Sequence, residues 1–331
     1  MILGNKKRFR SYVKGAIATA VVFTVLAAVS AVPPWSAAQP TESPTEAPPV
    51  VTLQAFLLDK GVFAPLDVPC ITQVGESGQE SFELTDLNNR GQIVGFCTDA
   101  GGTIRGIVLD HGAVTNIEFP GAVVTAALGI NDRRQIVGSY SEVGGADVLT
   151  TLRGFLLDDG VYTSIDIPDA SSTDVEGINN HGQMVGRYID AAGAVHGFLL
   201  DQGRVTTIDV PGATLTVAFK INDRKQIVGL YSDTESTLPF VGPVHGFLFD
   251  NGEFTRIDFP GALSTLPLGI NNRGQIVGTY SDEAIGHGFL LQKDTFTTID
   301  APGAVLSTAA FSINDRGQIL ILADSSEEET P

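Results

Sequence analysis

The sequence is poor in tryptophan, cysteine and basic residues. One Trp and two Cys occur among 331 residues, and 20 Lys and Arg stand against 38 Asp and Glu, which gives a formal net charge of −18. Such an excess of negative charge repels phosphate backbones and anionic lipid surfaces. We therefore expect neither nucleic-acid binding nor electrostatic docking on membranes. The one Trp, Trp35, lies near the N-terminus, so the rest of the chain has no indole platform for sugars.

Motifs for catalysis and for cofactors are also missing. The chain has no G-x-S-x-G, no H-E-x-x-H, no P-loop and no Rossmann fingerprint. The sequence therefore predicts no catalytic residue, no metal and no cofactor.

The N-terminal region has the organisation of a secretory signal peptide. Five basic residues up to Lys14 precede an apolar stretch at 15–32, and Ser36-Ala37-Ala38 supplies small residues before a cleavage point. An uncleaved membrane anchor is the alternative. We expect residues 1–38 to be removed and the protein to be secreted, extracellular or in the cell envelope, with no membrane attachment afterwards. Residues 39–50 form a linker rich in Pro, Thr and Glu, and 325–331 form an acidic tail.

Removal of residues 1–38 leaves 15 basic against 38 acidic residues, a formal charge of −23 on the mature chain.

Six copies of one pattern fill residues 51–324. The Asn of an Ile-Asn or Leu-Asn pair recurs at Asn88, Asn131, Asn179, Asn222, Asn271 and Asn314. An acid two residues before a proline recurs at Asp67, Glu118, Asp166, Asp209, Asp258 and Asp300.

Each copy indicates four short strands joined by hairpin turns, and several of these strands are apolar throughout. Sheets that are covered on both faces need such strands, and the stacked blades of a propeller provide that cover. The sequence predicts an all-β, six-bladed β-propeller of six four-stranded repeats of ~46 residues. We expect strands near 55–69 to share a sheet with strands near 304–322. A parallel solenoid is the alternative.

A second periodicity lies over the first. The residue after the repeated Asn alternates strictly, as Asn89, Asp132, Asn180, Asp223, Asn272 and Asp315. The connection from the fourth strand of one copy to the next copy is long after copies two and four. These alternations predict three units of two blades each.

The repeat resembles that of the HAF-repeat family of extracellular bacterial proteins. The residues concerned are His196-Gly197-Phe198, His245-Gly246-Phe247, His287-Gly288-Phe289 and the stretch from Ile270 to Gly278. The resemblance covers about 51–322 and implies an extracellular, propeller-like repeat without a defined reaction. Two departures are Gly in place of Ala in the triplet, and Arg105 and Arg153 in place of His.

The repeated His, Arg and acidic residues have structural interpretations. Gln54, Arg105, Arg153, His196, His245 and His287 share a position at which every residue donates hydrogen bonds. We expect donors that fix the start of a strand rather than a metal cluster. We expect the repeated acids to cap the Pro-Gly turns, and Tyr140, Tyr188, Tyr231 and Tyr280 to pack between blades.

Function is predicted from the loops that break the repeat. Loops on a rigid scaffold are the usual seat of specificity, and the two long connections carry apolar residues. The candidate ligand-binding residues are Leu149, Leu152, Leu238, Pro239, Phe240 and Val241. They either contact a partner or pack on neighbouring blades. We expect a monomeric binding or scaffolding module for an unknown extracellular protein or polymer. A hydrolase or lyase acting on extracellular polymers and a structural envelope component are the alternatives.

The sequence predicts a disulfide between Cys70 and Cys97. Both cysteines replace repeat residues within one copy, and an oxidising address permits the bond. It would close a loop worth about 3 kcal/mol in the chain-entropy model. Peptide mapping of secreted protein without reductant should recover one cross-linked peptide pair. Alkylation of both cysteines without prior reduction would contradict the prediction.

Overall fold

The chain is all β in the computed structural model. The structure describes residues 51–68, 81–98, 103–144, 148, 151–234, 243–282 and 285–326. These residues form 24 strands and no α-helix. Within those ranges, no helix is available that could span a bilayer.

Four sheets have four antiparallel strands each, and in each sheet the strands follow one another in chain order. The first consists of β3 (Ser81–Leu87), β4 (Ile93–Thr98), β5 (Ile104–Asp110) and β6 (Ala113–Ile117). The second consists of β7 (Val124–Ile130), β8 (Ile136–Ser141), β9 (Arg153–Asp158) and β10 (Val161–Ile165). The third consists of β11 (Ser172–Ile178), β12 (Met184–Ile189), β13 (Val195–Asp201) and β14 (Arg204–Ile208). The fourth consists of β15 (Leu215–Ile221), β16 (Ile227–Ser232), β17 (His245–Asp250) and β18 (Glu253–Ile257).

The remaining strands belong to one mixed eight-stranded sheet. Its members are β19 (Ser264–Ile270), β20 (Ile276–Ser281), β21 (Gly286–Gln292), β22 (Thr295–Ile299), β23 (Ala304–Ile313), β24 (Ile319–Ser326), β1 (Val51–Asp59) and β2 (Val62–Leu66). One parallel residue pair, Gly286 with Ser307, joins β21 to β23.

The prediction of six separate four-stranded blades is therefore wrong. The arrangement is that of a β-propeller, but it has four four-stranded blades and one eight-stranded mixed sheet. The physical reason is the length of β23. It has 10 residues where β19 has 7, and Ser307 in its first half reaches β21 of the preceding repeat.

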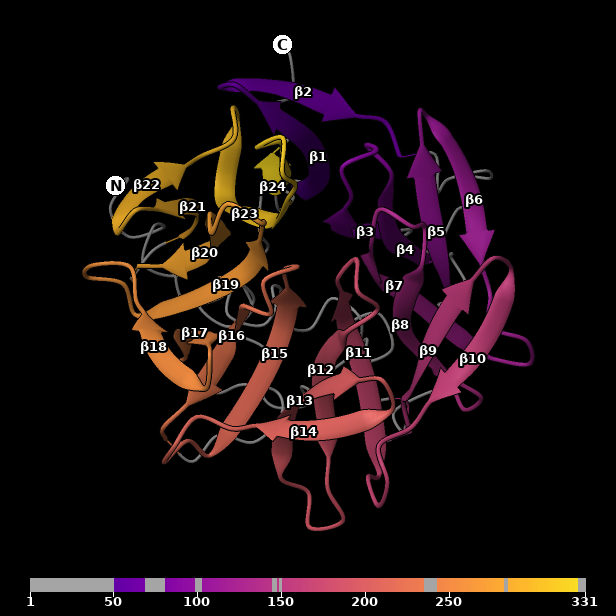
Figure 1. The fold of residues 1–331 in the computed structure, drawn as a ribbon. Helices are drawn as coiled ribbons and strands as arrows, with labels where there is room; N and C mark the ends of the chain where they lie inside the picture. Colours follow the sequence, from indigo (N-terminus) through magenta and orange to yellow (C-terminus); the bar gives the residue numbers. More distant parts are fainter. Residues whose placement is uncertain are drawn as a thin grey trace, which may run out of the picture.

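The two ends of the repeat array share a sheet, as the sequence predicts. Strand β1 pairs antiparallel with β24 from Val51 opposite Ser326 to Leu58 opposite Ile319. Figure 1 shows β1 and β2, in indigo, beside the yellow β24. Hydrogen bonds between the first and last described strands thus close the array.

The strand that ends in Ile-Asn or Leu-Asn is the innermost of each repeat. The innermost strands β3, β7, β11, β15, β19 and β23 each contact the next one around the axis, and β23 contacts β3. Figure 1 shows them around the centre of the molecule. Their C-terminal ends all lie at one end of the axis, which we call the Asn face. The opposite end is called the His face.

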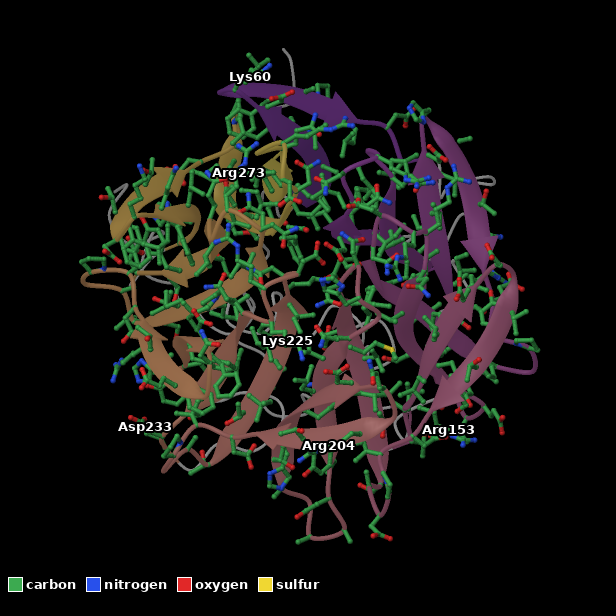
Figure 2. The ribbon with its side chains drawn as sticks, in the orientation of Figure 1. Lys60, Arg153, Arg204, Lys225, Asp233 and Arg273 are labelled. Carbon is green, nitrogen blue, oxygen red and sulfur yellow. The ribbon has the colours of Figure 1, made fainter. Side chains whose placement is uncertain are left out.

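The repeated glycines of the second strands and the repeated phenylalanines form one packing unit. In the fourth sheet Gly229 pairs with Phe247, which is buried. A Cβ on Gly229 would lie 2.0 Å from the backbone oxygen of Val217 on β15 and 2.8 Å from the Phe247 ring. The ring therefore occupies the space that a side chain at Gly229 would need. Figure 2 shows side chains filling the space between the sheets.

Candidate functional site

Six equivalent turns meet at the Asn face, and each is held by the side chain of its first Asn. The turns are 88–92, 131–135, 179–183, 222–226, 271–275 and 314–318. In one of them, the side-chain oxygen of Asn222 accepts hydrogen bonds of 3.0 Å from the backbone N–H groups of Arg224 and Gln226. The Asn222 amide also donates to Oε1 of Gln226 at 2.8 Å.

The same six asparagines link neighbouring turns. The second amide hydrogen of Asn222 is donated to the backbone oxygen of Asn271 at 3.0 Å. Equivalent bonds join every turn to the next. The bond from Asn314 to the backbone oxygen of Asn88, at 3.2 Å, closes the circle. The repeated Asn is therefore a structural residue of the ring.

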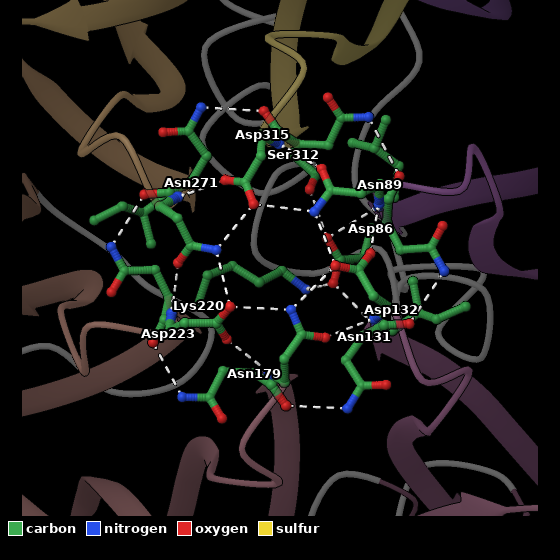
Figure 3. A pocket seen from close by; sticks show the side chains of 18 of the residues that line it. Asp86, Asn89, Asn131, Asp132, Asn179, Lys220, Asp223, Asn271, Ser312 and Asp315 are labelled. Atoms are coloured by element: carbon green, nitrogen blue, oxygen red, sulfur yellow. Dashed lines mark hydrogen bonds and ion pairs between the residues drawn. The ribbon is translucent and has the colours of Figure 1, made fainter.

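The next residue of each turn forms an inner circle, which we call the Asn/Asp ring. Its members are Asn89, Asp132, Asn180, Asp223, Asn272 and Asp315. Each Asn amide donates to Oδ2 of both flanking aspartates at 2.9–3.0 Å. Each backbone N–H donates to Oδ1 of the next ring residue at 2.7–2.9 Å. Figure 3 shows the ring around the axis.

The alternation of Asn and Asp follows from hydrogen-bond complementarity. An amide nitrogen only donates and an ionised carboxylate only accepts. Six asparagines would place amide hydrogens against amide hydrogens, and six aspartates would place carboxylates against carboxylates. Strict alternation satisfies both N–H groups of every amide. The period of two turns seen in the sequence therefore has a direct chemical cause.

The ring leaves an opening along the axis that is about the size of a water molecule. The six bonded Nδ2 and Oδ2 atoms form a hexagon with sides of 2.9–3.0 Å. The radius of a regular hexagon equals its side, so the axis passes about 3 Å from each atom, which is hydrogen-bond distance. A cavity of about 80 Å³ lies here, lined by the turns and by the ends of the inner strands. A volume of this size has room for a few water molecules.

An ion pair forms the floor of this cavity. Lys220 of β15 extends to Asp86 of β3, with Nζ 3.3 Å from Oδ2, and also donates to the backbone oxygens of Leu128 and Glu176. Ser312 donates to the other Asp86 oxygen at 2.5 Å. At the matching position the three other inner strands have glycine. A Cβ at Gly177 would lie 2.7 Å from a backbone oxygen and 3.3 Å from Cδ of Lys220, so the lysine needs a small neighbour.

A buried polar cluster lies on the inner strands farther along the axis. Asp174 accepts hydrogen bonds from Ser139 and, at 3.1 Å, from Arg187, whose side chain is also buried. Burial first, and the charge of Glu176 second, raise the pKa of Glu83 well above its ordinary value. Glu83 is 4% exposed, and its Oε2 has no hydrogen-bond partner among the described residues.

Glu176 carries the second carboxyl group whose pKa is strongly raised. Part of its side chain remains accessible, but the protein surrounds it closely enough that burial is the main cause of the shift. Burial and the charge of Asp174 together outweigh Arg187 and Lys220 and raise the pKa of Glu176 to about 8. Sequence reasoning missed this cluster. The available signal is that Asp174 and Glu83 occupy an inner-strand position where the other copies have Ala, Val or Leu.

On the His face, the repeated donors pair with the repeated acids. Nδ1 of His196 lies 2.7 Å from Asp209, and the pairs His245–Asp258 and His287–Asp300 repeat the contact at 3.2 and 2.8 Å. Arg153 takes the position of His and binds Asp166 at 2.5 Å. Burial lowers the pKa of His196, but hydrogen bonds and charges from Asp209 and Asp190 outweigh it and raise that pKa.

The prediction that these acids cap the Pro-Gly turns is wrong. A threonine of the inner strand takes that role. Oγ1 of Thr216 accepts a bond of 3.1 Å from the backbone N–H of Val210, the residue after Asp209. Thr125, Thr173, Thr265 and Thr308 accept the equivalent bonds. Among the described residues, five of the six acids instead bind the His or Arg across the strand pair, namely Glu118, Asp166, Asp209, Asp258 and Asp300.

The tyrosines at the ends of the second strands pack as predicted. Tyr140 and Tyr280 are buried, and their rings stack on Phe119 and Phe259 with centroids 3.6 Å apart. Tyr188 and Tyr280 also stack on His196 and His287 at 5.0 Å. No set of three His, Cys, Asp or Glu among the described residues has the geometry to hold a metal ion.

The predicted ligand-binding residues are only partly within the described residues. Leu152 is 2% exposed and packs in the main hydrophobic core, together with Val148. Leu149, Leu238, Pro239, Phe240 and Val241 lie outside the described residues. Cys97 lies on β4, opposite Phe82 and Arg105, whereas Cys70 lies outside the described residues. The disulfide stays a prediction.

Comparison with known proteins shows the fold and no family. No family model matches the chain, and no curated protein matches it. A putative TolB from Agrobacterium tumefaciens is similar in structure, with a TM-score of 0.59, 11% identity, and coverage of 84% of this chain and 99% of that one. TolB from Acinetobacter baumannii has a TM-score of 0.51 at 12% identity, and covers 75% of this chain. The match spans only 55% of the TolB chain from Acinetobacter baumannii. At such identities the likeness is one of fold.

The Asn/Asp ring predicts the effect of exchanging one acceptor for a donor. In Asp223→Asn, the new amide would face the amides of Asn180 and Asn272, and their hydrogen bonds to Oδ2 would be lost. We expect a loss of about 2 kcal/mol in the free energy of unfolding, because unsatisfied amide groups remain. Urea denaturation measures this, with Asp294→Asn in an exposed turn as the control. A more stable Asp223→Asn would show that carboxylate repulsion outweighs complementarity.

The buried carboxyls predict a pH dependence of stability. Because the pKa of Glu176 rises from 4.5 to about 8 on folding, the native state binds more protons than the unfolded state between these values. Stability should therefore fall as pH rises from about 4.5 to about 8. Glu176→Gln, which cannot ionise, should reduce this fall and be more stable than the wild type at pH 8. If the free energy of unfolding changed with pH in the same way for both proteins, the raised pKa of Glu176 would be contradicted.

Proposed function

We propose that the chain is a secreted, monomeric, non-catalytic binding module of the HAF-repeat type, and that its ligand contacts the His face. The observation that carries the proposal is that both long connections leave this face. Strand β8 ends at Ser141 and β9 begins at Arg153, while β16 ends at Ser232 and β17 begins at His245. Both connections join the second and third strands of their sheets.

Further groups on the His face support binding there. Val123, Val143 and Leu263 are about half exposed and adjoin the His-face ends of β7, β8 and β19. The bases of the two connections are firmly anchored, because the backbone oxygens of Leu152 and Val244 accept bonds from Thr173 and Thr265. Variable loops with rigid bases are the arrangement that specific recognition commonly uses.

The long connections can be shortened without removing these anchors. Residues 142–151 and 233–243 would each be replaced by the four residues 282–285 that join β20 to β21. Leu152 and Val244, which are buried, stay in place. We expect the trimmed protein to keep a cooperative thermal unfolding transition, at a lower temperature because the buried Val148 is removed from the core. It should lose binding, because the asymmetric surface is gone.

Binding and turnover should be measured on the same probes. Co-sedimentation with purified peptidoglycan, xylan and chitin reports binding, and the release of new reducing ends reports catalysis. The proposal expects the wild type to bind at least one probe without turnover. Turnover by the wild type would favour a hydrolase or lyase. If the trimmed protein bound the probe as well as the wild type does, the ligand would not contact these loops.

A further inference from the structure

Five arginines and one histidine form a second circle on the Asn face, which we call the Arg circle. Its members are Arg90, Arg133, His181, Arg224, Arg273 and Arg316. Each directly follows a residue of the Asn/Asp ring, so their Cα atoms lie ~3.8 Å from those of the ring. All six side chains are exposed.

The fold itself does not require these guanidinium groups. What each turn uses is the backbone N–H, as in Arg224, which donates to the Asn222 side chain. Within the described residues, none of the five arginines has a side-chain hydrogen bond or ion pair, whereas Arg153, Arg187 and Lys220 are all paired. His181 occupies the same turn position, so the geometry accepts another side chain.

The acids outside the circle are already engaged. At the strand ends, Gln183 donates to Asp201 and Lys225 forms an ion pair with it at 2.9 Å. Gln92 and His111, together with the charge of Arg134, lower the pKa of Asp110. Lys225 and Arg134 adopt φ values of 64° and 67° where the other four turns have glycine. Backbone strain is thus accepted at two places where a cation neutralises an outer acid.

The charges are arranged as a positive circle around a negative centre. The ring aspartates lie on the axis side, each accepting three hydrogen bonds, and they repel any anion placed at the centre. The net charge of −18 repels long polyanions that would extend beyond the circle. A ligand that fits is small, has several anionic groups at its edge and carries none at its middle.

We propose that the Arg circle binds a compact, ring-shaped polyanion whose phosphate or carboxylate groups are arranged around its periphery. Arginine suits this task because its planar guanidinium binds phosphate and carboxylate through two parallel hydrogen bonds. The hydrogen-bonded turns hold the six Cα positions before the ligand arrives, which lowers the entropic cost of binding. This inference does not depend on the proposed function, since it concerns the opposite face.

The probes are inositol hexakisphosphate for phosphate and benzenehexacarboxylate for carboxylate. Isothermal titration of the full chain at low ionic strength should give binding to at least one of them, weakening as salt is added. The tighter probe identifies the anionic group. If neither probe binds, or if inorganic phosphate binds as tightly as both, the proposal is overturned.

Matched variants separate the circle from general electrostatics. Arg90→Ala/Arg224→Ala/Arg273→Ala removes three charges from the circle, and Lys60→Ala/Arg204→Ala/Lys293→Ala removes three exposed charges at the outer hairpins of the same face. Figure 2 shows Lys60 at the outer margin and Lys225 near the centre. The first variant should bind roughly tenfold more weakly, and the second should stay within about twofold of the wild type.

One substitution should strengthen binding. His181→Arg completes the circle with a sixth guanidinium at a position where the turn already accepts arginine, so the probe should bind about twofold more tightly. Equal losses in the two triple variants, or weaker binding by His181→Arg, would overturn the assignment. The loop-trimmed protein serves as a further control, because it leaves all six turns of the Asn face unchanged and should bind the probe like the wild type.

Discussion

The hydrogen-bond complementarity of the Asn/Asp ring is the constraint on which the Asn face depends. Every inner strand ends in a turn whose first Asn binds the next turn and whose second residue enters the ring. Donor and acceptor must alternate, so an odd number of turns could not close the ring without one mismatched pair. The side chains of the ring satisfy one another, so their hydrogen bonds hold the six turns close to the axis.

Sequence patterns predict the strands, the turns and the closure of the ends, because these depend on local chemistry that recurs in each copy. They also reveal the Asn/Asp alternation, although its meaning required the side chains to be seen face to face. The merging of two repeats into one eight-stranded sheet was not predictable in this way. It depends on a single parallel pair, Gly286 with Ser307, between segments that the repeat pattern treats as separate.

The axial carboxyls show a different limit of sequence reasoning. Glu83 and Asp174 break an apolar position of the repeat, and that break could have been noticed by aligning the six copies. The alignment does not show that the position faces the axis, since the innermost strand was unknown. Without that fact, a charged residue in a strand is more simply assigned to the solvent side. The burial of Glu83, and the lack of a hydrogen-bond partner for its Oε2 among the described residues, are properties of the assembled ring.

The acidic side chains on the two faces of the ring have different kinds of partner. On the His face, five of the six repeated acids meet a His or Arg of their own sheet, so charge is balanced within a blade. On the Asn face, the ring aspartates are satisfied by amides and backbone N–H groups, and these neutral donors leave the arginines of the Arg circle without a described ion-pair partner. Neutral hydrogen bonding to the aspartates is therefore what leaves cations available in a chain that is acidic overall. A ring closed by six arginine–aspartate pairs would give the same topology but would have no such surface.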